Sequence, residues 1–453
     1  MTGPTDVVAD LLAVAGLDPA ASDRLGVTGP AEVLPSVYPV TTAASASVGA
    51  ALVAAALLTD AGDVGLDTRH VAAAFRSERH LAVDGRPPAD PWDPIAGHYP
   101  VADGGWVQLH TNFPHHRRAA VVSLGLPPDA TRDEVAAELA GWDAQDVEDV
   151  VNAAAGCASR MRTRGEWLAH PQAAAIADLP VLEVERVGDA PLEEPRPGGI
   201  RVLDLTRVIA GPVAGRFLAA IGADVLAVTA AHLPQVTSIL PDANVGKRST
   251  FLDLREPEGY EAMQRLVAGA DVVIGSYRPG ALAGLGFGWD DLVRMRPGLV
   301  VVELSAYGGV GPWGGRRGFD SLVQTATGIC DEGRRAAGAD RPVPLPCQAL
   351  DHATGYLAAF GALAALQRRC TEGGSWRARV ALARTGCWLD GLGRLEAGLS
   401  IRDPAAAEVA PYLVDLAAAS GAVTLVQPPG SIDGRPLAWP NPPPVLGSDQ
   451  PTW

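Results

Sequence analysis

The stretch from Val202 to Pro212, VLDLTRVIAGP, places a run of apolar residues directly before a run of small ones. The apolar run is typical of a short buried strand, and the small residues of Ala210–Gly215 (AGPVAG) are typical of a helix start that follows it closely. Small residues there would let a phosphate or nucleotide approach the backbone, or would permit a tight strand-to-helix connection. The residues alone leave both interpretations open.

The same alternation continues toward the C-terminus. Helical patterns such as Glu256–Ala268 separate further apolar runs. The runs that we predict to be strands are Val202–Leu205, Val225–Val228, Val272–Ile274 and Leu299–Leu304. This alternation predicts an α/β fold with a Rossmann-like parallel sheet between helices. A nicotinamide dinucleotide site would also need Gly-x-Gly-x-x-Gly after the first strand and an acidic residue after the second, and the sequence has neither.

Segments rich in proline and glycine divide the chain of 453 residues into four regions. The breaks are Gly85–Pro94, Pro191–Gly199 and Pro428–Pro444. We predict a helical region at 1–94, a smaller α+β domain at 95–198, a Rossmann-like ligand-binding half at 199–345, and a helix, a strand and a proline-rich tail at 346–453.

Within the smaller domain, His98–His110 predicts a hairpin that turns around Asp103-Gly-Gly105. Two later segments have the Thr-x-x-Glu spacing of a capping box, which marks a helix start. These segments begin at Thr131 and Thr163. The smaller domain is therefore predicted to be a hairpin followed by helices.

The formal net charge of −16 argues against nucleic acid and anionic membranes as partners, and an anionic ligand would need a local basic pocket. The five cysteines lack any C-x-x-C spacing, so neither a disulfide framework nor a metal site is expected. The N-terminus has no basic and apolar segments of a signal peptide, and the apolar run Ala43–Leu58 is too short for a membrane span. We therefore expect a cytoplasmic protein.

Two distant segments resemble each other. Tyr38–Leu58 and Pro344–Ala364 are each a proline-containing loop that leads into an alanine-rich helix. Aligning Gly49 with Gly355 places Ser45 opposite Asp351. The similarity is either an internal repeat, with a carboxylate in the second copy alone, or the chance likeness of two alanine-rich helices.

Asp351 follows the apolar Ala349-Leu350 and precedes a helix that we expect to begin at about His352. Aspartate is a preferred N-cap, because its carboxylate accepts hydrogen bonds from free backbone N–H groups. The same position sets a carboxylate against an apolar loop, where it could act as a nucleophile or an acid–base group. Position alone favours the cap.

Two further segments carry polar chemistry. The glycine-rich Ala306–Pro312 follows a predicted strand and is either a source of amide donors for an anion or a flexible surface loop. His110, His115 and His116 could suggest a metal, but they lack helical i, i+4 spacing and a carboxylate partner. We interpret the His115-His116 pair as a solvated helix start.

Taken together, residues 199–390 resemble the class III CoA-transferases, a group of formyl-CoA and carnitine-CoA transferases that also includes α-methylacyl-CoA racemases. The segments that carry the resemblance are Val202–Pro212, Gly222–Leu226, Lys247–Ser249, Leu252–Gly259, Ala270–Ile274, Tyr277–Gly280, Gly318–Asp320 and Asp351–Gly355. With weaker segments, the resemblance extends over about 38–445.

The resemblance implies that Asp351 is the nucleophile of a CoA transfer from an acyl-CoA thioester to a carboxylic acid. It also implies CoA esters as substrates, a small carboxylate as the second substrate, no tightly bound cofactor or metal, and a homodimer. The CoA-contact positions of the family fall here on Val208, Leu252, Arg255, Ser276, Tyr277, Arg278, Leu285 and Ser305. Arg255 and Arg278 are the candidate phosphate partners.

The sequence departs from the family at three points. Leu226–Ala230 reads LAVTA where the family commonly has a run like Ile-Lys-Val-Glu-Pro, so charged groups near the CoA site are missing. Phe319 stands where the racemases have a histidine, which disfavours two-base proton exchange. The segment that resembles the family's small domain precedes the Rossmann-like half instead of following its aspartate helix.

This order suggests one of two arrangements. Either a truncated, degenerate copy of the family's fold, which would include 1–94, is fused to a second copy, or the chain is a circular permutation of that fold. The alternatives to a transferase are a non-catalytic partner subunit and an acyl-CoA racemase or isomerase.

Overall fold

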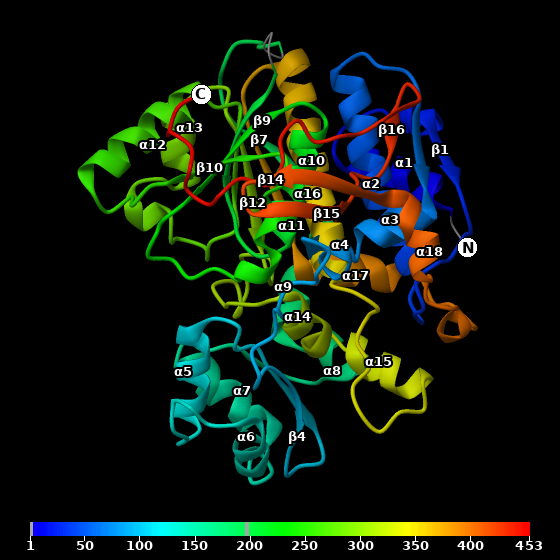
Figure 1. Ribbon diagram of the computed structural model, residues 1–453, viewed down its shortest axis with the longest axis vertical. Coiled ribbons are helices and arrows are strands. Elements are labelled where there is room, and N and C mark those ends of the chain that lie inside the picture. Colours follow the sequence, from blue (N-terminus) through cyan, green and yellow to red (C-terminus); the bar gives the residue numbers. More distant parts are fainter. Residues whose placement is uncertain (1–2, 195–198) are drawn as a thin grey trace.

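The computed structural model describes residues 3–194 and 199–453 and is built around a seven-stranded sheet (Figure 1). The strand order is β10-β9-β8-β11-β12-β13-β7. The strands are β7 (Leu182–Gly188), β8 (Arg201–Leu205), β9 (Asp224–Thr229), β10 (Arg248–Phe251), β11 (Val272–Gly275), β12 (Val300–Ser305) and β13 (Ser375–Ala381). Neighbouring strands from β10 to β13 are parallel, and β7 pairs with β13 in the antiparallel direction. The α/β class with a parallel sheet is therefore confirmed.

Alternating side chains of the strands enter two separate cores. Val202, Val272 and Val300 pack with one pair of helices, α10 (Ala210–Ala220) and α16 (Ala349–Glu372). Leu203 and Val273 face the opposite layer, which holds α12 (Pro257–Gly269) and α13 (Trp289–Met295). Successive side chains of a strand point to opposite faces of the sheet. Because helices cover both faces of this sheet, each predicted strand is apolar at consecutive positions and not only at alternate ones.

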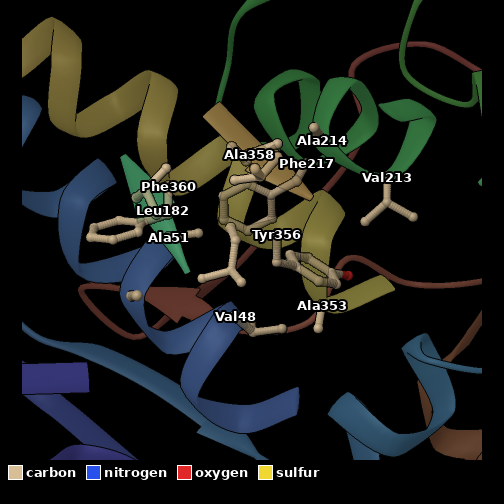
Figure 2. Packing of buried hydrophobic residues seen from close by; sticks show 14 of the residues in the cluster. Val48, Ala51, Leu182, Val213, Ala214, Phe217, Ala353, Tyr356, Ala358 and Phe360 are labelled. Carbon is tan, nitrogen blue, oxygen red and sulfur yellow. The ribbon is translucent and has the colours of Figure 1, made fainter. Parts of the chain in front are cut away.

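Two long alanine-rich helices, α2 (Val40–Leu58) and α16, pack against each other in the largest core. Figure 2 shows Val48 and Ala51 of α2 beside Tyr356 and Phe360 of α16. The helix α2 has 19 residues, so the expectation of a run too short to span a membrane is wrong. By length and composition it could cross a bilayer, but 89% of its most apolar window is buried inside the protein.

The elements around the two helices also match. The strand β1 (Leu25–Thr28) precedes α2 and pairs in parallel with β2 (Val64–Asp67), which follows it. In the same order, β12 precedes α16 and pairs in parallel with β13. This shared order supports the internal repeat.

The smaller domain is an antiparallel sheet with helices. Its strands are β4 (Gly97–Pro100), β5 (Trp106–Leu109) and β6 (Ala158–Arg160), and its helices are α5 (Pro114–Ser123), α6 (Arg132–Leu139), α7 (Ala144–Ala153), α8 (Arg164–Leu168) and α9 (Pro171–Ile176). The predicted hairpin and both capping boxes, at Thr131 and Thr163, are confirmed. The strand β7 lies in the predicted range 95–198 but joins the large sheet. The break at Pro191–Gly199 lies partly outside the described residues.

The C-terminal segment returns to the first part of the chain (Figure 1). The strand β15 (Gly421–Val426) pairs with β14 (Leu413–Ala418) and β3 (Ala82–Val83), and β16 (Ser431–Ile432) pairs with β2 and β17 (Arg435–Pro436). Beyond these strands, Trp439 and Trp453 donate their indole N–H groups to the carbonyls of Arg216 and Leu266 at 3.0 and 2.9 Å. The predicted proline-rich tail is thus docked along its length.

Short helices complete the chain. They are α1 (Pro4–Val14), α3 (Thr68–Ala74), α4 (Ser77–His80), α11 (Leu240–Asn244), α14 (Asp320–Ala326), α15 (Ile329–Ala336), α17 (Leu382–Gly391) and α18 (Ala406–Val409). Of these, α4 and α14 approach the start of α16, where they contribute the acidic groups described below.

Candidate active site

The helix α16 begins at Ala349, two residues after Cys347 and earlier than expected. Asp351 is its third residue, and Gln348 occupies the N-cap position, so the interpretation of Asp351 as the N-cap is wrong. A different carboxylate does the capping: Asp320, at the start of α14, accepts the backbone N–H of Asp351 at 2.9 Å. The carboxylate of Asp351 is therefore not needed to satisfy the helix start.

The Asp351 side chain is buried, with 8% of the residue exposed, and no donor to its carboxylate is found among the described residues. Burial, followed by the charges of Asp320 and Glu78, raises the pKa of Asp351 well above its ordinary value. Burial also raises the pKa of Asp320 to about 7, although Asp320 accepts hydrogen bonds from the Asp351 backbone and from Gln324. Two such carboxyl groups titrate as a pair.

A third acidic group reaches the site from the N-terminal region. Glu78 of α4 lies 3.2 Å from Nε2 of His352, whose ring is fully buried and stacks on Phe75 at 5.3 Å. Burial opposes ionisation of Glu78, but the hydrogen bond and charge of His352 leave its pKa lowered. Glu78 and His352 were missed in the sequence, which has no local signal for a contact across 274 positions.

Val208 marks the other side of the site. Its φ angle of 73° is rare for a β-branched residue, and such strained positions cluster at functional sites. Gly355, one turn below Asp351 on the same face of α16, packs against the backbone of Ala210: a Cβ on this glycine would lie 2.4 Å from the Ala210 carbonyl oxygen. Asp351 therefore lies on the face of α16 that meets the start of α10, which begins two residues after Val208.

The predicted CoA-contact residues line three neighbouring cavities. Leu252, Arg255, Tyr277 and Leu285 line one of about 150 Å³. Tyr277 also lines a larger one of about 390 Å³, together with Arg278 and Ser305. Val208 lines a third of about 30 Å³ with Phe113 and Arg207. Ser276 and Asp351 line none of the three, so the structure brings most but not all of the predicted positions together.

The positive charge near these cavities differs from the prediction. Arg255 is engaged by Asp253, with its Nε 2.8 Å from Oδ1 of that residue, so its charge is partly neutralised. By contrast, Arg207, Arg278 and Arg317 have no carboxylate within ion-pair distance among the described residues, and burial, then the charge of Arg278, lowers the pKa of Arg317. Arg207 lies over the rings of Phe113 and Tyr277 at 5.6 and 5.3 Å. These three unpaired arginines form the local basic site that the acidic chain requires for an anion.

The small residues at the start of α10 serve close packing. A Cβ on Gly211 would lie 2.2 Å from the Thr206 side chain, and one on Gly215 would lie 2.4 Å from Oδ2 of Asp204. Asp204 in turn holds the buried ammonium of Lys247 at 2.7 Å. The interpretation as a tight strand-to-helix connection is therefore favoured.

The glycine-rich segment after β12 is braced by the smaller domain. The side-chain amide of Gln172 donates to the carbonyls of Tyr307 and Val310, each at 2.8 Å, and its oxygen accepts the N–H of Trp313. The N–H of Gly308 donates to Oγ of Ser305 at 3.1 Å. The segment is thus held in place, and the amides of Gly308 and Trp313 are already engaged.

The histidines of the smaller domain also correct the sequence interpretation. His110 and His116 are each only 4% exposed, whereas His115 is exposed. The prediction of a solvated pair is therefore correct for His115 and wrong for His116. Within the described residues, no group of three or more histidines, cysteines or carboxylates is arranged to hold a metal ion.

Comparison with known proteins shows which proteins the chain resembles. Residues 198–397 match the sequence model of CoA-transferase family III. An acetyl-coenzyme A transferase of Hypoxylon pulicicidum is 36% identical over 44% of this chain and 35% of its own length. A probable fatty acyl-CoA transferase of Mycobacterium tuberculosis is 39% identical over 39% of this chain and 47% of its own length.

A solved structure of a CAIB/BAIF family protein from Brucella suis is 27% identical, with a TM-score of 0.38, and the match covers 52% of this chain and 65% of that chain. The chain spans less than half the length of the two curated relatives. Residues 198–397, which contain Asp351 and every predicted CoA-contact position, match CoA-transferase family III.

Proposed function

We propose that this protein transfers CoA between an acyl-CoA thioester and a carboxylic acid, with Asp351 as the nucleophile. The observation that carries the proposal is the division of roles at the start of α16. Asp320 satisfies the helix start, which leaves the buried carboxylate of Asp351 without a structural hydrogen bond among the described residues. A buried carboxylate with no capping role is suited to covalent catalysis.

The proposed reaction exchanges an acid for a thiol without water. The Asp351 carboxylate attacks the thioester carbonyl, the C–S bond breaks, and the products are a mixed anhydride and CoA thiolate. The thiolate then attacks the Asp351 carbonyl of the anhydride, which releases the first acid and leaves an aspartyl-CoA thioester. A second acid repeats the two steps in reverse order and leaves as its CoA ester, and the Asp351 carboxylate is regenerated.

The carboxyl groups near Asp351 influence its protonation state. Because burial raises the pKa of both Asp320 and Asp351, and the charge of Asp320 raises that of Asp351 further, the pair retains a proton near neutral pH. Only the ionised form of Asp351 is a nucleophile, and its pKa is raised well above its ordinary value, so formation of the anhydride should become faster as the pH rises.

We propose that CoA esters bind in the cavities on either side of Tyr277, with their phosphates near the unpaired Arg207 and Arg278. Arg255 is a weaker candidate because Asp253 already binds its guanidinium. The missing charges of the LAVTA run at Leu226–Ala230 are thus compensated from other segments. A homodimer and a cytoplasmic location remain expectations from the sequence.

Trapping the covalent intermediate tests the proposal. The protein is incubated with a panel of acyl-CoAs, treated with hydroxylamine, and digested for mass spectrometry. We expect a hydroxamate at Asp351 only when an acyl-CoA has been added, and none at the exposed Asp290, which serves as an internal control. If CoA esters bind but no acyl-CoA labels Asp351, the protein is instead a non-catalytic relative of the transferases.

A further inference from the structure

Two buried histidines of the smaller domain have ring nitrogens without partners. His110 directly follows β5, and His116 lies in α5. Nδ1 of each is buried and has no hydrogen-bond partner among the described residues. Native proteins rarely bury a polar atom in this way, and a ligand or water is the usual partner of such an atom.

Both rings are uncharged at neutral pH. Burial lowers the pKa of His110 and of His116 to about 3, and the neighbouring charges of Arg317 and Arg207 act in the same direction on His116. A neutral imidazole has one N–H donor and one acceptor nitrogen. The pair can therefore donate hydrogen bonds to an anion without itself requiring a counter-ion.

The two histidines lie beside the proposed active site. The His110 ring stacks flat on Phe319, with ring centroids 3.7 Å apart and planes 3° apart, and His116 meets the edge of the same ring at 5.8 Å. Phe319 immediately precedes Asp320, the residue that caps the helix of Asp351. The histidine pair is therefore linked through Phe319 to the residue that caps the helix of Asp351, and Arg207 lies between Phe113, which contacts His116, and Tyr277.

The surroundings favour a negative ligand. Arg317 is two residues before Phe319 and has no carboxylate partner among the described residues. The nearby acid of the smaller domain, Asp93, is occupied by Arg117 and by the hydroxyl of Thr111, each at 2.8 Å.

We propose that His110 and His116, with Arg317, bind the carboxylate of the free acid that exchanges CoA with Asp351. The inference rests on the proposed function and extends it, because it assigns the second substrate to residues of the smaller domain. The reaction requires two anions near Asp351, and the Tyr277 cavities account for CoA alone.

Paired substitutions of His116 test this subsite. His116→Leu removes both ring nitrogens, whereas His116→Gln keeps a donor and an acceptor in the same place. We expect the Leu variant to raise the KM for the free acid at least tenfold and to leave the Kd for CoA unchanged, and the Gln variant to recover most of the loss. Arg118→Ala removes an exposed cation from the same helix and controls for a general change of charge.

Binding of the acid is also measured without turnover, by saturation-transfer NMR with acetate, succinate and hexanoate. We expect at least one acid to bind the unsubstituted protein and to be lost in His116→Leu. Failure of all three to bind, or an equal loss of CoA and acid affinity in a folded Leu variant, overturns the subsite. Should the Leu variant not fold, Arg317→Gln must give the same selective rise in KM. Loss of hydroxamate trapping with acid binding intact would instead refute the transferase proposal alone.

Discussion

The helices α2 and α16 are alike in packing and unlike in chemistry. Both are buried and rich in alanine, and both lie between two strands that pair in parallel. At the position aligned with Asp351, however, α2 has Ser45, which is fully buried and whose hydroxyl has no partner among the described residues. Small residues are sufficient for the packing of two helices, whereas the proposed reaction also needs a carboxylate at the start of one of them.

The surroundings of Asp351 and Ser45 differ as much as the two residues themselves do. At the start of α16, Asp320 supplies a cap from a separate helix. The loop before α2 is held differently: Oγ of Thr41 accepts the N–H groups of Val33 and Leu34 at 2.9 and 3.1 Å. The start of α16 is therefore a candidate site through contacts from α4 and α14 as well as through one aspartate.

The largest expected effect is on activity. Asp351→Asn should reduce CoA transfer by a factor on the order of 10³ or more, because the amide is not a nucleophile. The free energy of unfolding should barely change, since Asp320 and not Asp351 caps the helix. Ser45→Ala is the matched change in α2 and should leave the transfer rate intact. Steady-state kinetics and urea unfolding give the two readouts, and an active Asn variant would rule out the nucleophile.

The next effect is on packing at the two aligned glycines. A Cβ on Gly355 would lie 2.4 Å from the backbone oxygen of Ala210, whereas one on Gly49 would meet the flexible end of Leu25 at 2.7 Å. Gly355→Ala should therefore lower the free energy of unfolding by about 1–3 kcal/mol. For Gly49→Ala, the gain in helix propensity of about 1 kcal/mol should offset most of the strain. Urea unfolding of both variants measures the difference, and equal losses would mean that the two helices approach their neighbours equally closely.

The smallest effect is a shift in pH dependence. Asp320→Asn keeps an oxygen that can accept the Asp351 N–H but removes the like charge, so the pKa of Asp351 should fall. In the pH–rate profile of CoA transfer, the rise in rate on the acid side should then occur at lower pH than in the unsubstituted protein.

The same substitution affects stability. Because the pKa of Asp320 is raised to about 7 in the folded protein, its protonated form favours folding, and that contribution is lost as the pH rises from about 4 through 7. The Asn variant should lose less stability over this interval. A pH–rate profile and thermal unfolding at pH 5 and pH 8 check both statements, and an unshifted acid limb would show that the two carboxyl groups do not interact.

The elements that could be predicted from the sequence are those with local causes. The strands β8, β9, β11 and β12 follow from short apolar runs, and the helix starts at Thr131 and Thr163 follow from capping-box spacing. Asp351 was identified as a candidate nucleophile through a resemblance spread over many short segments. The role of helix cap was assigned wrongly, because Asp is both a common cap and a common nucleophile, and only its hydrogen bonds distinguish the two.

By itself, the sequence determined the alternation of strands and helices, the alanine-rich pair of helices and the position of the candidate nucleophile. Only the tertiary structure decided that Asp320 caps α16, that Glu78 reaches His352, and that His110 and His116 are buried against Phe319. Strand and helix signals act between residues a few positions apart. The protonation of a carboxyl group depends instead on burial and on charges contributed by segments hundreds of residues away, and these distances exist only in the folded chain.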